Sequence, residues 1–245
     1  MDVNKVSDFI MQRYKKEFTY GIIMGSGQNI GQKSSDKIGY NKIPGFISST
    51  VSGHAGLFSS FSINNHNILS AAGRFHYYEG YKFNQVVSLI DIFDSLGINK
   101  IIITNSSGCL NAAWNLNKLM LVKKFIDTTM MVSKDIKEIK LPLSNIYNKI
   151  ANQCYSGTYA QVIGPTYETV SEINLFKKLG VDAVGMSTVP EIRRCIELKK
   201  DFVVICGLTN YASGISNSIP SHQEVLDNAE SLNNELNRTI NLIIK

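Results

Sequence analysis

Short apolar runs rich in β-branched residues recur along the chain, and each ends abruptly in small or polar residues. The clearest are 20–29 (YGIIMGSGQN), 100–111 (KIIITNSSGCLN), 159–169 (YAQVIGPTYET), 182–188 (DAVGMST) and 202–214 (FVVICGLTNYASG). Continuous apolar runs of this length are typical of strands that are buried on both faces. The sequence therefore predicts buried strands with polar groups at their C-terminal ends.

Segments with helical periodicity lie between these runs. FNQVVSLIDIFDSLG is apolar on one face and ends at Gly97, a residue type common just beyond a helix. Its apolar face consists of Val86, Ile90, Phe93 and Leu96. Capping boxes predict three further helix starts. They pair Thr169 with Glu172, Thr188 with Glu191, and Ser221 with Glu224.

The mostly alternating order of strands and helices predicts a layered α/β fold. In such folds ligands bind where the C-terminal ends of the strands open a crevice, so the polar strand ends are expected to converge. No repeat, linker or proline-rich stretch divides the chain, although residues 127–156 are the least patterned. We therefore expect one domain over residues 1–245.

Composition narrows the class of protein. The chain has 245 residues, of which 44% are hydrophobic and 18% charged, values typical of a globular domain large enough to bury a core. The net charge is +5, but the basic residues are scattered and their densest runs are pairs of lysines. A nucleic-acid groove needs basic residues concentrated on one face, so nucleic acid is not an expected partner.

Cysteine usage and the N-terminal sequence indicate a cytoplasmic protein. Cys109, Cys154, Cys195 and Cys206 show no C-x-x-C spacing, and three of them lie in apolar or helical contexts that suit free buried thiols, so a reducing compartment is expected. The first residues lack the continuous apolar segment of a secretion signal, and no run approaches the length of a membrane span. We therefore expect a soluble, unexported protein without membrane association.

Several common catalytic and binding motifs are absent. Gly25-Ser26-Gly27 follows a predicted strand, but residue 30 is Ile and no Gly-Lys-Ser/Thr follows, so neither a dinucleotide nor a nucleoside triphosphate is expected. His54 lies between glycines in SGHAG, where a surface histidine is the ordinary interpretation, and no zinc-ligand spacing surrounds it. No G-x-S-x-G motif offers a covalent nucleophile. The sequence thus predicts no metal site.

The segment GRFHYYEGY (73–81) has neither helical nor strand periodicity. It is either a polar loop or a group of hydrogen-bonding side chains around a ligand. Glu168, in GPTYET, is also open to two interpretations, because an acidic residue is favoured at a helix start whether or not it binds a ligand.

Taken together, several motifs resemble the trimeric purine nucleoside phosphorylase family in both identity and order. They are GSG, GHAG, GRFHYYEGY, TNSSG, GPTYETVSEI, GMSTVPE, LTN and SHQEVL, and they run from about residue 20 to residue 226. The resemblance implies a central mixed, twisted and partly barrel-like β-sheet flanked by helices. It also implies a homotrimer that cleaves the N-glycosidic bond of purine nucleosides with inorganic phosphate as co-substrate and without a cofactor.

The same resemblance assigns a phosphate site. Its expected ligands are Ser26, Arg74, His76, Ser187 and the backbone N–H of Ser106, with His54 beside the phosphate. A guanidinium group can donate two charge-assisted hydrogen bonds to phosphate, and hydroxyl and amide groups can complete the shell. The other side chains of GRFHYYEGY are then expected to orient Arg74 and His76.

The nucleoside site is likewise implied by the resemblance. The ribose is expected to contact Tyr78, Met186 and His222, and the base is expected to contact Glu168 and Asn210. Tyr167 is also expected to bind the nucleoside. A carboxylate can accept the N1–H of hypoxanthine or guanine, while an amide can donate to O6 and accept from N7–H as the base leaves. The expected catalytic residues are therefore Asn210, Glu168 and His76.

This chain departs from the family pattern at several places. Gln28-Asn29 stands where Leu-Gly is common, Ser106-Ser107-Gly108-Cys109 where Ala-Ala-Gly-Gly is common, and Tyr211 where Lys is frequent. Residues 127–156 are shorter than the family region that usually lends an aromatic residue to a neighbouring subunit. Two alternatives therefore stay open: a methylthioadenosine phosphorylase, and a nucleoside-binding protein with weakened catalysis.

Overall fold

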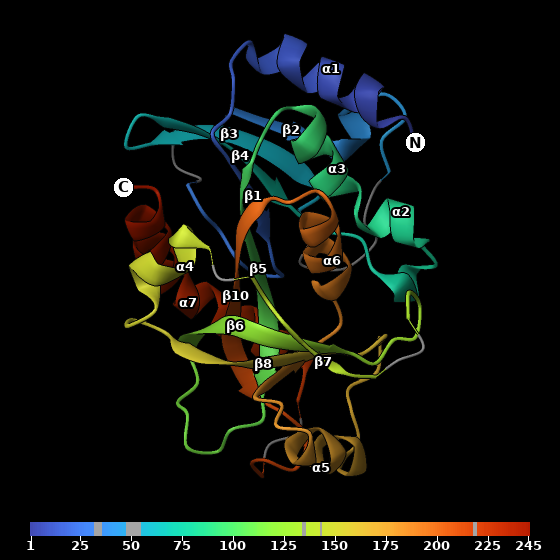
Figure 1. The fold of residues 1–245 in the computed structure, drawn as a ribbon, viewed down its shortest axis with the longest axis vertical. Coiled ribbons are helices and arrows are strands. Elements are labelled where there is room, and N and C mark those ends of the chain that lie inside the picture. Colours follow the sequence, from blue (N-terminus) through green and yellow to red (C-terminus); the bar gives the residue numbers. More distant parts are fainter. Residues whose placement is uncertain (32–35, 48–54, 134–135, 143, 218–219) are drawn as a thin grey trace.

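The computed structural model describes residues 1–31, 36–47, 55–133, 136–142, 144–217 and 220–245 (Figure 1). Its α-helices are α1 (Val3–Tyr14), α2 (Phe83–Val86), α3 (Ser88–Ser95), α4 (Asn145–Ile150), α5 (Val170–Lys178), α6 (Val189–Glu197) and α7 (His222–Ile243). Its strands are β1 (Tyr20–Met24), β2 (Asp36–Gly39), β3 (Leu57–Ile63), β4 (His66–Ala72), β5 (Lys100–Cys109), β6 (Lys118–Asp127), β7 (Glu138–Lys140), β8 (Tyr155–Gln161), β9 (Ala183–Gly185) and β10 (Asp201–Tyr211). Short 3₁₀ helices span Tyr40–Lys42 and Tyr77–Glu79.

One mixed sheet organises the fold. Strands β5, β10, β6, β8 and β9 pair in a closed ring, because β5 bonds both β9 and β10. From β5 the sheet continues through β1, β4 and β3 to β2. Parallel and antiparallel pairs both occur. The expected mixed, partly barrel-like sheet is therefore confirmed, and each of the apolar runs forms a strand.

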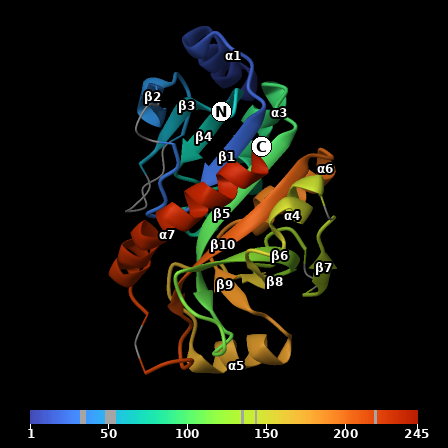
Figure 2. The same cartoon turned by 90° about the vertical axis from the view of Figure 1, so that its left-hand side faces the viewer.

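Both faces of the open part of the sheet are covered by helices, which explains why its strands are continuously apolar. Ile23 of β1 and Ile103 of β5 pack in the cluster that contains residues of α1, α3 and α6. Their neighbours Ile22 and Ile102 belong to the cluster that contains residues of α4 and α7. Figure 2 shows α7 running diagonally across this second face. Strands buried on both sides lose the polar alternation of a half-exposed sheet.

Two predicted helix features differ from the structure. The segment at 83–97 forms α2 and α3 with a break at Val87 rather than one helix. Three of the four residues of its apolar face are buried, Leu96 is half-buried, and Gly97 has a positive φ of 73°. The capping box at Thr188 is wrong: its φ is 86°, its side chain does not cap α6, and Glu191 lies against Arg74 instead. The capping box at Thr169 is confirmed, and the Ser221 hydroxyl accepts from the Glu224 N–H.

The structure also bears on the weakly patterned region and the cysteines. The region 127–156 contains β7 and α4, with residues 134–135 and 143 outside the described part. The four cysteines are free, as expected, and Cys154 is the least buried of them. Within the described ranges, no helix combines the length and apolar character that a membrane span requires.

Candidate active site

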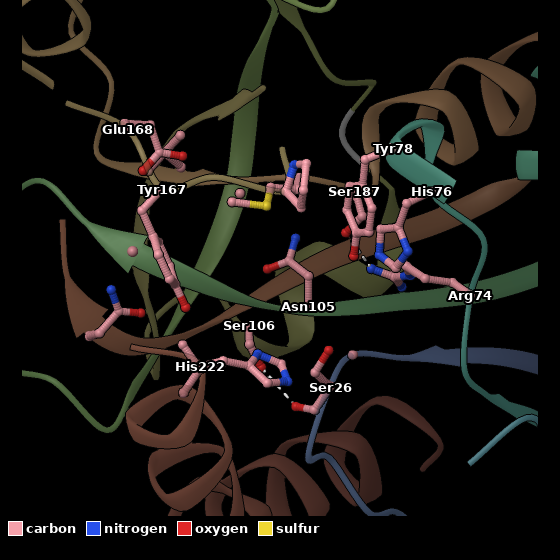
Figure 3. Close-up of a pocket in the computed structure, with 18 of the residues that line it drawn as sticks. Ser26, Arg74, His76, Tyr78, Asn105, Ser106, Tyr167, Glu168, Ser187 and His222 are labelled. Carbon is pink, nitrogen blue, oxygen red and sulfur yellow. Dashed lines mark hydrogen bonds between the residues drawn. The ribbon is translucent and has the colours of Figure 1, made fainter. Parts of the chain in front are cut away.

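The predicted site residues gather around a cavity of about 460 Å³ at the C-terminal ends of β1, β5, β9 and β10 (Figure 3). The loop after β4, the loop before α5 and the start of α7 complete its walls. The predicted residues that line it are Ser26, Arg74, His76, Tyr78, Ser106, Tyr167, Glu168, Met186, Ser187, Asn210 and His222. His54 lies outside the described residues.

Glycines allow the strand ends to meet closely. A Cβ atom on Gly25 would lie 2.7 Å from the Asn105 Cα, so the end of β1 touches the backbone of β5. Gly164 has a φ of 76°, and a side chain there would collide with Met186. These close approaches bring residues from distant parts of the sequence to one cavity.

Arg74 forms one wall of the cavity and is itself almost fully buried. Its Nη1 donates to Ser187 Oγ at 2.9 Å and to Thr188 Oγ1 at 3.1 Å, and its Nη2 donates to the Thr104 carbonyl at 2.7 Å. Its Nε lies 3.3 Å from Glu191 Oε1, with side-chain exposures of 1% and 0%. The guanidinium is thus held in one orientation, with Ser187 shared between it and the cavity.

His76 is oriented by Glu79, which sequence reasoning treated only as support. The His76 Nδ1 lies 2.8 Å from Glu79 Oε1, which also accepts from the His76 backbone N–H at 2.9 Å. The ring stacks on Tyr78 with a centroid separation of 4.6 Å. Glu79 therefore fixes the orientation of the imidazole ring through its Nδ1 edge. The i,i+3 spacing of His76 and Glu79 was the available sequence signal.

Asn105 and Thr188 were missed from sequence. Asn105 lines the cavity, donates through Nδ2 to Thr188 Oγ1 at 3.0 Å, and accepts from the Ser107 hydroxyl at 2.6 Å. Thr188 is fully buried and holds a positive φ that is rare for a residue of its type. Strained residues of this kind cluster at functional sites. The only sequence signal for Thr188 favoured a helix cap, and Asn105 had none.

Glu168 lies away from the guanidinium, and Figure 3 shows Glu168 and Arg74 on opposite sides of the cavity, whose wall also includes Asn210. Burial raises the pKa of the Glu168 carboxyl group, although a hydrogen bond from its own backbone N–H opposes the shift. Asn210 donates through Nδ2 to the Tyr211 carbonyl at 3.0 Å and accepts through Oδ1 from the Thr209 hydroxyl at 3.0 Å. An amide keeps one donor and one acceptor position free after these two bonds.

Aromatic and histidine side chains also line the cavity. Burial raises the pKa of the Tyr78 hydroxyl, and nearby Glu79 adds to that shift. Burial also raises the pKa of Tyr167, which lies at the cavity wall with 37% of its surface exposed. Both hydroxyl groups are therefore neutral donors at physiological pH. His222 begins α7, next to the capping residue Ser221, and reaches the cavity from below in Figure 3.

Comparisons with known proteins identify the family. Residues 19–245 match the phosphorylase superfamily. Purine nucleoside phosphorylase 1 of Bacillus subtilis is 31% identical over 251 residues, which cover 94% of this chain and 93% of that protein. Solved structures of Schistosoma mansoni purine nucleoside phosphorylase in complex with inosine and with adenosine have TM-scores of 0.84 and 0.83 at 27% identity, covering 99% of this chain and 95% of theirs. The chain therefore belongs to the phosphorylase superfamily and, within it, to the purine nucleoside phosphorylases.

Proposed function

We propose that this chain phosphorolyses 6-oxopurine ribonucleosides and deoxyribonucleosides, such as inosine and guanosine, to the free base and (deoxy)ribose 1-phosphate. Inorganic phosphate is the co-substrate, and no other cofactor takes part. One observation carries the proposal: a single cavity has an arginine and hydroxyl groups at one side, and a carboxyl group and an amide elsewhere on its wall. Such a cavity can hold an anion and a purine base together.

The phosphate end supplies charge and hydroxyl donors. The wall of the cavity includes Ser26, Ser187, His76, Arg74 and Ser106, and the backbone N–H of Ser106 is proposed to donate to the phosphate. Phosphate bound there lies close to the anomeric carbon of the ribose, where it stabilises the oxocarbenium-like transition state and then forms the new C–O bond. No protein nucleophile is required, and positioning and charge supply the catalysis.

The base end stabilises the leaving group. Ionised Glu168 accepts the N1–H of a 6-oxopurine, while Asn210 donates to O6 and accepts from N7–H. The second contact strengthens as N7 gains its proton, so it favours the transition state over bound substrate. Asn210 thereby acts on the leaving base directly.

The base contacts argue against a methylthioadenosine phosphorylase, and the fixed position of Arg74 argues against a pure binding protein. Adenosine and methylthioadenosine have an unprotonated N1 and a 6-amino group, which a carboxylate acceptor and an amide donor match poorly. A pure binding protein has no use for an arginine whose terminal nitrogens are fixed by Ser187, Thr188 and Thr104. We therefore favour the phosphorylase for 6-oxopurines.

A comparison of four nucleosides at saturating phosphate tests this substrate choice. We expect kcat/KM for inosine and guanosine to exceed that for adenosine and methylthioadenosine by at least about 100-fold, because the disfavoured bases leave buried polar groups unpaired. Equal rates for methylthioadenosine and inosine would instead support the methylthioadenosine phosphorylase. Nucleoside binding without base release would support the weakened binder.

Nucleoside affinity is expected to decrease as the pH is lowered, because Glu168 becomes protonated. The pKa of this carboxyl group is raised above 4.5, so the N1–H acceptor is lost at a higher pH than for an ordinary glutamate. Loss of a hydrogen bond to a charged acceptor weakens binding by roughly 10- to 100-fold. Equilibrium binding of inosine without phosphate, from about pH 8 down to about pH 5, measures the change.

Glu168→Gln is the control for this pH dependence. An amide has no proton to gain in this range, so its inosine affinity is expected to be weaker but flat with pH. A wild-type affinity that is equally flat would contradict the assignment of Glu168 to the base.

We further propose a homotrimer that works in the cytoplasm. Free cysteines are consistent with a reducing compartment. Met130, Met131 and Val132, after β6, are exposed apolar side chains, and exposed patches of this kind mark protein contacts. Mass measurement in solution tests the trimer, and a monomer at working concentration would contradict it.

A further inference from the structure

The loop at 25–31 carries Ser26 into the phosphate end of the cavity and is held by a buried glutamine. Gln28 has only 7% of its surface exposed. Its Oε1 accepts from the Gly25 N–H at 2.8 Å, and its Nε2 donates to the Asn105 carbonyl at 2.8 Å. The Thr104 hydroxyl also donates to the same Oε1. One side-chain amide therefore closes the loop on itself and ties it to β5.

A second bond joins the same two segments. The Ser106 hydroxyl donates to the Ser26 carbonyl at 3.0 Å. The β5 segment that receives these ties also receives the Arg74 guanidinium, through the Thr104 carbonyl. Ser26 and Arg74 are thus both hydrogen-bonded to the short segment of β5 that contains Thr104 and Ser106.

Asparagines of α7 hold the other side of the loop. The Asn29 N–H donates to Asn233 Oδ1 at 2.8 Å, and Asn237 Nδ2 donates to the Asn29 carbonyl at 3.0 Å. Asn233 Nδ2 also donates to the Gly27 carbonyl at 3.4 Å. Side-chain amides here satisfy peptide groups that would otherwise need a strand or helix partner.

We propose that Gln28 and Asn233 are positioning residues for the phosphate subsite, acting through the loop at 25–31. The inference rests on the proposed function, since it assigns a purpose to the way that loop is held. Gly27 and Gly31 have φ values of 70° and 67°, so the loop includes freely adaptable residues and no regular hydrogen-bond ladder of its own. The amides from two sides restrict it to one conformation. A small displacement of a binding group costs much of its effect, so Ser26 depends on this support.

The test uses variants that remove the ties without touching phosphate. Gln28→Leu removes the bonds to Gly25, Thr104 and Asn105 at nearly constant volume, and Asn233→Ala removes those to Gly27 and Asn29. Asn241→Ala is the matched control, because Asn241 lies on the same helix and, among the described residues, donates to the Asn237 carbonyl and not to the loop at 25–31. Both alanine changes alter helix propensity equally. For each protein we would measure KM for phosphate, Kd for inosine without phosphate, and the rise in melting temperature with inorganic phosphate.

We expect Gln28→Leu and Asn233→Ala each to raise KM for phosphate about tenfold, with Kd for inosine within about twofold of wild type. Their stabilisation by phosphate should shrink accordingly, whereas Asn241→Ala should behave as wild type. An unchanged phosphate KM in both variants would overturn the inference, as would equal losses in phosphate and inosine binding, which indicate a general structural role. If Gln28→Leu does not fold, Asn233→Ala decides alone.

Failure of the proposed function has a different signature. Wild-type protein would then release no base, yet the phosphate-dependent rise in melting temperature still reports the subsite. Loss of that rise in Gln28→Leu or Asn233→Ala, but not in Asn241→Ala, would support the inference. Retention of the rise in both Gln28→Leu and Asn233→Ala would overturn it.

Discussion

Arg74→Ala is expected to lower kcat/KM for phosphate by roughly 10³-fold, while the affinity for inosine changes by less than about threefold. Arg74 lines the cavity at the end where we propose that phosphate binds, on the side away from Glu168 in Figure 3. Its removal takes away a positive charge of the proposed phosphate site and the donor to Ser187 Oγ. Steady-state kinetics with varied phosphate, and equilibrium binding of inosine, give the two values.

The structure adds a cost in stability that the sequence did not predict. Arg74 lies beside Glu191, and both side chains are almost fully buried. Removing one member of a buried ion pair costs about 3–5 kcal/mol, so Arg74→Ala should also melt at a lower temperature.

Arg74→Lys separates the two effects. It keeps a cation near Glu191 but cannot form the fork that reaches Ser187, Thr188 and Thr104 together. We expect it to retain much of the stability and still to lose most of the phosphate affinity. An alanine variant with a normal phosphate KM, measured below its melting temperature, would contradict the phosphate assignment.

Asn210→Asp is expected to change substrate choice, lowering the ratio of kcat/KM for inosine to that for adenosine by roughly 100-fold. The amide donor to O6 is replaced by an acceptor, which suits the 6-amino group of adenosine. The ratio follows from initial rates of base release for the two nucleosides at saturating phosphate. An unchanged ratio would contradict the assignment of Asn210 to the base.

The neighbours of Asn210 also predict lower absolute rates for this variant. In the wild-type protein Asn210 Nδ2 donates to the Tyr211 carbonyl, and an aspartate would place an oxygen against that carbonyl. Asn228→Asp is a suitable control, because Asn228 donates to the Thr209 carbonyl beside Asn210 but does not line the cavity. It introduces the same charge nearby and should leave the inosine-to-adenosine ratio unchanged.

The strands and their meeting point could be predicted from the sequence because burial on both faces leaves a direct signature. Ile22 and Ile23 face opposite clusters, so the run at 20–24 is apolar throughout. Polar residues that follow such runs must converge where the strands end. The closure of β5 onto both β9 and β10 had no such signature in the pattern and came only through the family resemblance.

Local patterns failed where a distant residue decides the outcome. Thr169-x-x-Glu172 and Thr188-x-x-Glu191 have the same form, yet only the first is a capping box. The difference is Arg74, which lies 114 positions before Thr188 in the sequence. It donates to the Thr188 hydroxyl and forms an ion pair with Glu191. The role of Gln28 could not be predicted for a related reason, since it depends on Thr104 and Asn105, which only folding brings near.

Release of base from inosine as a function of phosphate concentration tests the central claim most directly. The proposal predicts hypoxanthine and ribose 1-phosphate in equal amounts, at a rate that saturates with phosphate and is negligible without it. Base release that does not depend on phosphate, with free ribose as the second product, would contradict it.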